Sequence, residues 1–121
     1  MMRFGCQDMV TQVRRILLKH PRDAFINQAT IDFQSSELNY SNTPDFEIAC
    51  KDYDQFLDLI RSFGPEIHFL PASNTSLDSI YTHDPCIVTN RGAILCNMGK
   101  PQRSKEPDKI EKYFTSIGVQ F

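Results

Sequence analysis

Apolar positions recur along this chain with two different periods, and each period predicts its own set of elements. Between residues 44 and 63, apolar side chains lie three and four positions apart, which predicts one amphipathic helix. Thr43 and Pro44 suit the start of this helix, and Gly64 suits its end. A second helix with one apolar stripe is predicted from about residue 107 to Gly118.

Short apolar runs bounded by turn-forming residues predict strands. These runs lie at 12–21, 30–35, 66–71, 85–89 and 93–97. The last two flank residues 90–92, so they predict a hairpin with a three-residue loop. Such a loop would place Cys86 opposite Cys96 on one face. Two reduced core thiols are expected there, with a disulfide as the lesser alternative, because disulfides are rare in chains without a secretory signal.

The order of the predicted elements repeats. Both "FLDLIRSFGPEIHFL" and "IEKYFTSIGVQF" end a helix, turn at a glycine and begin a strand. We therefore predict an α+β fold with about two strand–strand–helix–strand units, at about 12–71 and about 78–121. The second unit stops early in its last strand, so we expect it to belong to a larger repeat array. A compact two-unit domain is the alternative.

Composition excludes several functional classes. The chain has 121 residues, 40% of them hydrophobic, and a net charge of −2, which is typical of one globular domain without a basic surface for nucleic acid. No apolar stretch reaches the roughly 18–20 residues that span a membrane. No signal peptide is evident, so a cytoplasmic location is expected. The spacing of the four cysteines and three histidines fits no zinc site, and no metal is expected.

The candidate chemistry is a group of charged residues around the predicted hairpin. Asp78, His83 and Asp84 precede its first strand, and a carboxylate beside a buried strand needs a partner. Two aspartates at fixed spacing can bind a guanidinium through charge-assisted hydrogen bonds, with His83 as a titratable neighbour. Asp84 before Pro85 can instead cap a turn. Arg103, in the following loop, can bind a carboxylate or simply be solvated.

The stretch "LDSIYTHDPCIVTNRGAILCNMGKPQRSKEP" (77–107) resembles the dimethylarginine dimethylaminohydrolase and amidinotransferase family. The segments "VRRILLKHP" and "LDLIRSFGPEIHFLP" upstream share the resemblance. It implies a β/α-propeller (pentein) fold built of strand–strand–helix–strand modules, of which this chain would hold an incomplete part. It also implies a cysteine nucleophile that hydrolyses N-methylated arginine to citrulline and a methylamine, without a cofactor.

The resemblance further implies roles for single residues. Asp78, His83, Asp84 and Arg103 would contact the substrate, with Asp84 on the guanidinium and Arg103 on the carboxylate. His83 departs from the glutamate that dimethylargininases carry, and His20 matches a position whose contact is made by the backbone carbonyl. The family's orienting acid, general-base histidine and nucleophilic cysteine lie beyond the matched part. The chain is therefore expected to lack the catalytic residues and to be inactive alone.

Two further functions stay open from the sequence. The first, within the same superfamily, is a segment of an amidinotransferase or of an arginine or agmatine deiminase. The second belongs to another class: a non-catalytic interaction module that pairs with itself or with a companion chain. Open strand edges and apolar surface on a partial repeat array would favour that pairing. Neither nucleic acid nor a membrane is expected as a partner.

Overall fold

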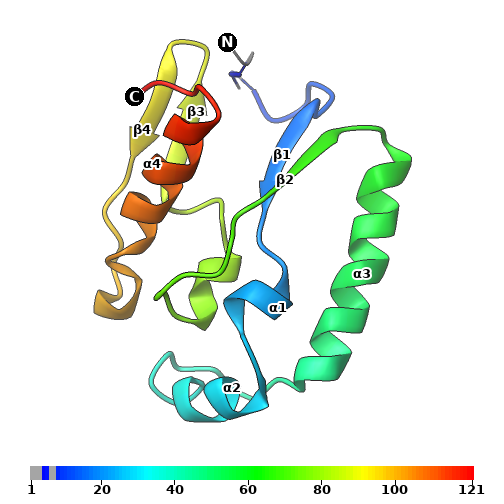
Figure 1. Ribbon diagram of the computed structural model, residues 1–121, viewed down its shortest axis with the longest axis vertical. Helices are drawn as coiled ribbons and strands as arrows, with labels where there is room; N and C mark the ends of the chain where they lie inside the picture. The colour runs from blue at the N-terminus through cyan, green and yellow to red at the C-terminus, as the bar shows by residue number, and fades with distance from the viewer. Residues whose placement is uncertain (1–3, 6–7) are drawn as a thin grey trace.

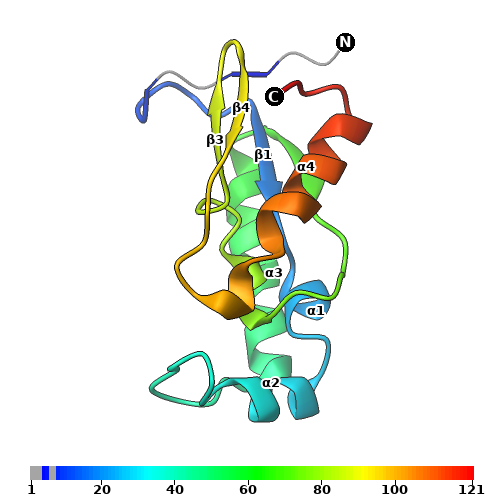
Figure 2. The same ribbon diagram turned by 90° about the vertical axis from the view of Figure 1, so that its left-hand side faces the viewer.

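Two small sheets and four helices make up the α+β fold of this computed structural model, which describes residues 4–5 and 8–121 (Figures 1 and 2). The strands are β1 (Arg15–Leu18), β2 (Glu66–Phe69), β3 (Cys86–Thr89) and β4 (Gly92–Leu95). The helices are α1 (Pro21–Ala24), α2 (Gln28–Gln34), α3 (Phe46–Ser62) and α4 (Glu106–Ser116). Two single-turn 3-10 helices, η1 (Leu77–Ile80) and η2 (Pro101–Arg103), precede β3 and α4.

The first sheet pairs β1 with β2 in parallel, so the chain must cross over between them. Helices α1, α2 and α3 form this crossover, and α3 runs alongside the sheet (Figure 1). The predicted long helix is confirmed, but Asp45 caps it in place of Thr43, with Oδ1 accepting the backbone N–H of Ile48 at 2.9 Å. Gly64 has φ 81° and turns the chain from α3 toward β2.

The second sheet is the antiparallel hairpin of β3 and β4, whose loop is one residue shorter than predicted. Thr89 pairs with Gly92, and the Thr89 hydroxyl bonds the Gly92 carbonyl at 2.7 Å, which tightens the turn. In this register Cys86 lies opposite Leu95. A shift of one residue moves a side chain to the other face of a strand. The predicted pairing of Cys86 with Cys96 is therefore wrong, and both thiols are free.

Helix α4 covers one face of the hairpin. The buried residues of this core are Leu70, Cys86, Ala93, Ile110 and Val119. The chain returns to the hairpin after Gly118, which has φ 90°, and the Gln120 carbonyl accepts the backbone N–H of Ala93 at 2.8 Å. The segment at 119–121, where a strand was predicted, is not a strand in this structure, but it makes this one backbone hydrogen bond to β4. A Cβ at Gly92 would lie 2.9 Å from that same carbonyl, so the approach requires glycine.

The strand predicted at 30–35 is wrong, because this segment lies in α2. The side chain of Asn27 accepts the backbone N–H of Thr30 at 2.8 Å and caps the helix. Ile31 is fully buried while Phe33 is 72% exposed, so the two do not share a face as they would in a strand. The division into units at 12–71 and 78–121 stays a prediction, and the first unit has a helix where its second strand was expected.

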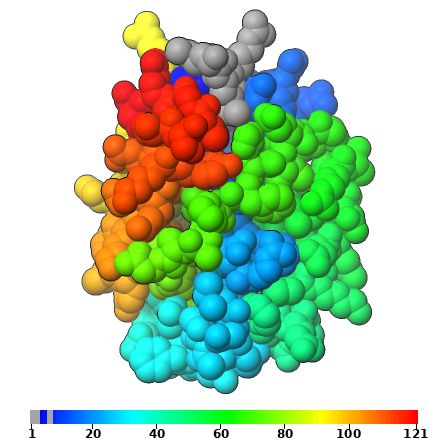
Figure 3. Space-filling model, in the orientation of Figure 1, coloured from blue at the N-terminus to red at the C-terminus, as the bar shows by residue number. Residues whose placement is uncertain are grey.

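The second core lies under α1 and α2. Its buried residues are Ala24, Phe25, Ile31, Leu38 and Leu77. Figure 3 shows the blue surface around α1 enclosed by α3, α2 and the segment before β3. These contacts place η1, and with it part of the candidate site, beside α1.

The helix at 28–34 can be tested with two substitutions only two residues apart. Ile31→Ala should lower the free energy of unfolding by about 2–5 kcal/mol, because it leaves a cavity in a closed core. Phe33→Ala removes an exposed ring and should change it by less than about 0.5 kcal/mol. Urea unfolding followed by circular dichroism measures both. Similar losses in the two variants would contradict the helix.

Candidate functional site

Arg103 at the end of η2 is the centre of a buried group of charges. Its Nε and Nη2 donate to the two carboxylate oxygens of Glu106, each at 2.8 Å. Its Nη1 donates to Oδ2 of Asp84 at 2.9 Å, and Nη2 also reaches the Tyr81 carbonyl at 3.3 Å. The guanidinium therefore joins the first turn of α4 to the turn that enters β3. Four hydrogen bonds use most of its five N–H donors.

The Arg103–Glu106 pair is nearly closed to water. The side chain of Glu106 is 3% exposed and that of Arg103 11%. Hydrogen bonding to Glu106, and then to Asp84, raises the pKa of Arg103 above its ordinary value, against an opposing effect of burial. The guanidinium carbon also lies 6.0 Å from the centre of the Tyr81 ring. A bidentate pair of this kind fixes the direction of the guanidinium, and so fixes where Nη1 meets Asp84.

Asp84 is the acidic residue of the group that faces solvent. Arg103 binds its Oδ2, while 49% of the side chain stays exposed. The following Pro85 is buried and leads directly into β3, which anchors the turn on the hairpin. His83 is exposed beside it and, within the described residues, makes no hydrogen bond or ion pair with Asp84. The structure thus presents one braced carboxylate and one exposed imidazole on the same turn.

Asp78 lies in η1 with its carboxylate buried, at 3% exposure, and both oxygens are occupied. Oδ1 accepts the Tyr40 hydroxyl at 2.7 Å, and Oδ2 accepts Nζ of Lys100 at 2.8 Å. Lys100 also donates to the Leu38 carbonyl at 2.8 Å. Burial, and then the bond to Asp78, raises the pKa of Tyr40, so its hydroxyl remains a donor. Among the described residues, no hydrogen bond or ion pair joins Asp78 to Asp84.

Sequence reasoning missed Tyr40 and Lys100. Tyr40 is the one aromatic residue in the polar stretch "SSELNYSNTP", and that isolation was the available signal. An aromatic side chain in an otherwise polar loop usually packs against something. Lys100 stands between Gly99 and Pro101 and carried no comparable signal. The contact depends on how η1 and η2 meet, which the local sequence does not determine.

His20 lies apart from this group and caps α1. Its Nδ1 accepts the backbone N–H of Arg22 at 3.0 Å, so Nε2 carries the proton that is donated to Oδ1 of Asp54 at 2.8 Å. Its carbonyl accepts the N–H groups of Asp23 and Ala24 at 2.9 and 3.0 Å. The carbonyl for which the resemblance implies a substrate contact is therefore used by the first turn of α1.

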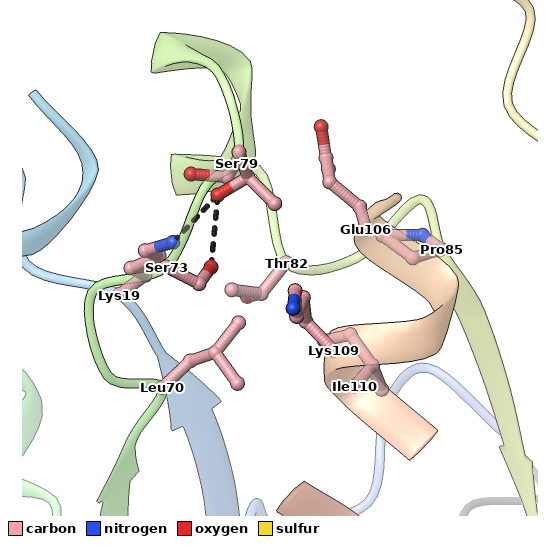
Figure 4. A pocket seen from close by; sticks show the side chains of 10 residues that line it. Lys19, Leu70, Ser73, Ser79, Thr82, Pro85, Glu106, Lys109 and Ile110 are labelled. Atoms are coloured by element: carbon pink, nitrogen blue, oxygen red, sulfur yellow. Dashed lines mark hydrogen bonds between the residues drawn. The ribbon is translucent and has the colours of Figure 1, made fainter. Parts of the chain in front are cut away.

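Lys19, next to His20, is completely buried. Its Nζ donates to Oγ1 of Thr75 at 3.1 Å, a bond drawn as a dashed line from Lys19 to the unlabelled Thr75 in Figure 4. Burial lowers the pKa of Lys19. The hydroxyl of Ser79 nearby is also buried and has no hydrogen-bond partner among the described residues. The space between these side chains, Glu106 and α4 is too narrow to admit a water molecule. It is a packing gap rather than a ligand site.

Two of the described cysteines, Cys86 and Cys50, do not have the character of nucleophiles. Burial raises the pKa of Cys86 to about 11, so this thiol is protonated near neutral pH. Burial also raises the pKa of Cys50, which lies on α3. Cys6 lies outside the described residues. Within them, no cluster of side chains could hold a metal ion, and no helix is long and apolar enough to cross a membrane.

Removing one charge of the buried pair should be costly. Glu106→Gln leaves the Arg103 guanidinium without its bidentate partner, and should lower the free energy of unfolding by about 3 kcal/mol. Glu111→Gln removes the same charge at an exposed position of α4, and should change it by less than about 0.5 kcal/mol. Chemical denaturation compares the two. Equal stability would mean that the pair does not hold α4 to the turn.

Comparison with known proteins gives three related findings. A family model described as "N,N dimethylarginine dimethylhydrolase, eukaryotic" matches residues 20–121. The N(G),N(G)-dimethylarginine dimethylaminohydrolase of Pseudomonas aeruginosa is 25% identical over 99 residues, which cover 82% of this chain and 36% of the relative. A crystal structure of a dimethylarginine dimethylaminohydrolase adduct with 4-chloro-2-hydroxymethylpyridine shares the fold, with a TM-score of 0.66 at 21% identity. That likeness covers 87% of this chain and 37% of the solved one.

Proposed function

Because the chain belongs to the N,N-dimethylarginine dimethylhydrolase family, we propose that it supplies part of the ligand-binding wall of a hydrolase that acts on guanidines. The chain spans just over a third of the length of the relatives that it matches, at 36% and 37%. The proposed reaction is hydrolysis of an N-methylated arginine to citrulline and a methylamine. A cysteine nucleophile outside this chain would carry it out.

One observation supports this proposal above the others: Asp84 is an exposed carboxylate braced by a buried arginine. A ligand guanidinium needs a carboxylate that is oriented and yet open on one side. Arg103 holds one oxygen of Asp84 while 49% of the side chain remains exposed. The turn is anchored on the hairpin because the buried Pro85 continues into β3. Asp84 is therefore the residue that we propose for the guanidinium contact.

The other implied contacts have unequal support. His83 is exposed and adjacent to Asp84 in the sequence, so it is accessible to a ligand that binds this turn. A ligand can reach the Asp78 carboxylate only if the Tyr40 hydroxyl or the Lys100 ammonium moves away from it. A substrate carboxylate could bind Arg103 only through the donor that remains, or by opening an internal bond, so we propose bracing as its main role. The His20 carbonyl is already engaged in α1.

We further propose that the α+β elements are modules of a β/α-propeller, with units at about 12–71 and 78–121. An amidinotransferase or an arginine or agmatine deiminase remains the alternative parent within the superfamily, because His83 replaces a glutamate. The isolated chain is proposed to be inactive, since a covalent mechanism requires a nucleophile and its base. A cytoplasmic location, with no cofactor, stays part of this proposal.

Binding and turnover can be tested separately on the purified chain. N(G),N(G)-dimethyl-L-arginine should shift the amide NMR signals of residues 81–84, with weak affinity on the order of 1 mM. Asp84→Asn should weaken this binding at least about fivefold, and Asp58→Asn, an exposed change on α3, should not. No citrulline should form above a heat-killed control. Citrulline production would overturn the proposed inactivity. An Asp84→Asn variant that binds the ligand as tightly as the unchanged chain would overturn the proposed contact between Asp84 and the guanidinium.

A second function, an interaction module, is favoured by exposed apolar surface. Ile87 and Ile94 face each other across the hairpin and are 56% and 55% exposed on the side away from α4. Phe56 and Leu59 on α3, and Phe63 at its C-terminal cap, are 40%, 58% and 65% exposed. Clustered apolar side chains of this size usually meet another surface. We propose that a companion chain or a second copy covers the hairpin.

Light scattering after size-exclusion chromatography tests this function. The chain should self-associate as its concentration rises, because the outer face of the hairpin can pair with itself. The double substitution Ile87→Ser and Ile94→Ser should make it monomeric while keeping its circular dichroism spectrum. Replacing Phe33 by Ser removes an exposed ring elsewhere and serves as the control. A wild-type chain that is monomeric at every concentration would argue against self-pairing.

A further inference from the structure

The carboxylate of Asp78 is paired with a lysine of its own chain, and this pairing bears on ligand choice. We propose that Lys100 is an exchangeable counter-ion of Asp78, which a ligand cation must displace before it reaches that carboxylate. Lys100 would then be a specificity-determining residue of the site. The inference rests on the proposed function, because it concerns cationic ligands of the same wall, but it assigns a role to a residue that the family resemblance leaves out.

The burial of the two partners is strongly unequal. The Asp78 side chain is 3% exposed, whereas 41% of the Lys100 side chain is exposed. Lysine extends its stem along the surface and can return its ammonium to water at small cost. A buried carboxylate cannot do the same, and its charge must stay compensated. Asp78 is therefore the fixed partner, and Lys100 is the mobile one.

Among the described residues, Lys100 is the one cation that contacts Asp78. The other hydrogen bond to this carboxylate comes from the neutral hydroxyl of Tyr40, at 2.7 Å. The Leu38 carbonyl adds a second acceptor for Nζ, so the ammonium lies between a carboxylate and a carbonyl. With both oxygens engaged and almost no exposed surface, Asp78 has no room to add a second cation. An incoming cation has to replace the first.

The local backbone lets Lys100 leave without disturbing the rest of the loop. Gly99 lies in open space, since nothing approaches within 4 Å of where its Cβ would be. Lys100 itself is extended, with φ −83° and ψ 129°, and makes no side-chain capping bond to η2. Arg103, three residues later, is different, because its side chain is 11% exposed and makes four hydrogen bonds. Displacement would thus involve the lysine side chain alone.

A displaced counter-ion lowers the apparent affinity of every ligand that uses Asp78, because binding includes the cost of exchange. Replacing Lys100 by methionine keeps the apolar stem and removes the charge. The unliganded chain should then become less stable, since Asp78 loses its partner. The same variant should bind a cation more tightly. If Lys100 had a purely structural role, its replacement would lower stability without tightening cation binding.

The test uses N(G),N(G)-dimethyl-L-arginine as the probe and follows its affinity by calorimetry or NMR titration. Lys100→Met should bind it at least about fivefold more tightly than the unchanged chain, while its thermal unfolding midpoint falls. Lys51→Met, an exposed change on α3, is the matched control and should alter neither. Combining Lys100→Met with Asp78→Asn should abolish the gain in affinity, because no uncompensated carboxylate remains.

The unchanged chain gives a second measurement that does not depend on a variant that folds. The 13Cε signal of Lys100 should move toward that of a free lysine as the probe saturates. Equal affinity of Lys100→Met, or a Lys100 signal that stays in place at saturation, would overturn the inference and leave the proposed function intact. A gain in affinity that survives Asp78→Asn would also overturn it. Absence of binding to every variant would overturn the proposed function together with the inference.

Discussion

The bidentate contact between Arg103 and Glu106 is the constraint on which the rest of the site depends. It joins residues only three positions apart, the last of η2 and the first of α4, and both side chains are nearly shielded from water. Two charges in such surroundings hold their geometry because any separation leaves one of them buried alone. The remaining donors of the arginine then fix the turn at Tyr81–Asp84. One contact therefore sets the position of α4 relative to the hairpin and the direction of the exposed carboxylate.

The segment from Gly99 to Glu106 supplies positive charges that pair with buried or partly buried carboxylates. Lys100 compensates Asp78, and Arg103 compensates both Asp84 and Glu106, so a short segment supplies the cations for three acidic residues. The two cations differ in burial, and this difference separates a fixed support from an adjustable contact. The proposed binding wall would use both properties, because a rigid frame orients its carboxylates and a mobile counter-ion can make way for a ligand.

Much of this architecture could be predicted from local patterns. The stripe of α3, the glycine after it, the two strands of the parallel sheet and the start of α4 were all evident in the sequence. The segment at 28–34 was not, because an alternation of two apolar residues over so short a run also occurs in a helix. Its capping residue, Asn27, was the better signal. The hairpin loop was predicted one residue too long, and that single residue moved Cys96 to the other face.

The site was predicted in part. The charged residues that approach the hairpin were found from their spacing, and Asp84 and Arg103 do meet. The partners of Asp78 were missed, because Tyr40 and Lys100 are distant from it in sequence and meet it only in the folded chain. The isolation of Tyr40 in a polar stretch indicated that it packs, but not against which residue. Sequence spacing shows which charged residues lie near one another along the chain. The partner of a buried charge depends instead on which distant loops the tertiary fold brings next to it.

The return of the chain to β4 also affects how the molecule behaves toward its own copies. An outer strand offers a row of unpaired N–H groups that can template pairing with another chain. Here the carbonyl of Gln120 already occupies the N–H of Ala93, and the missing side chain at Gly92 makes room for it. The segment at 119–121 thus covers part of the edge of β4. Association through this edge would first have to displace that segment, whereas association through the apolar outer face would not.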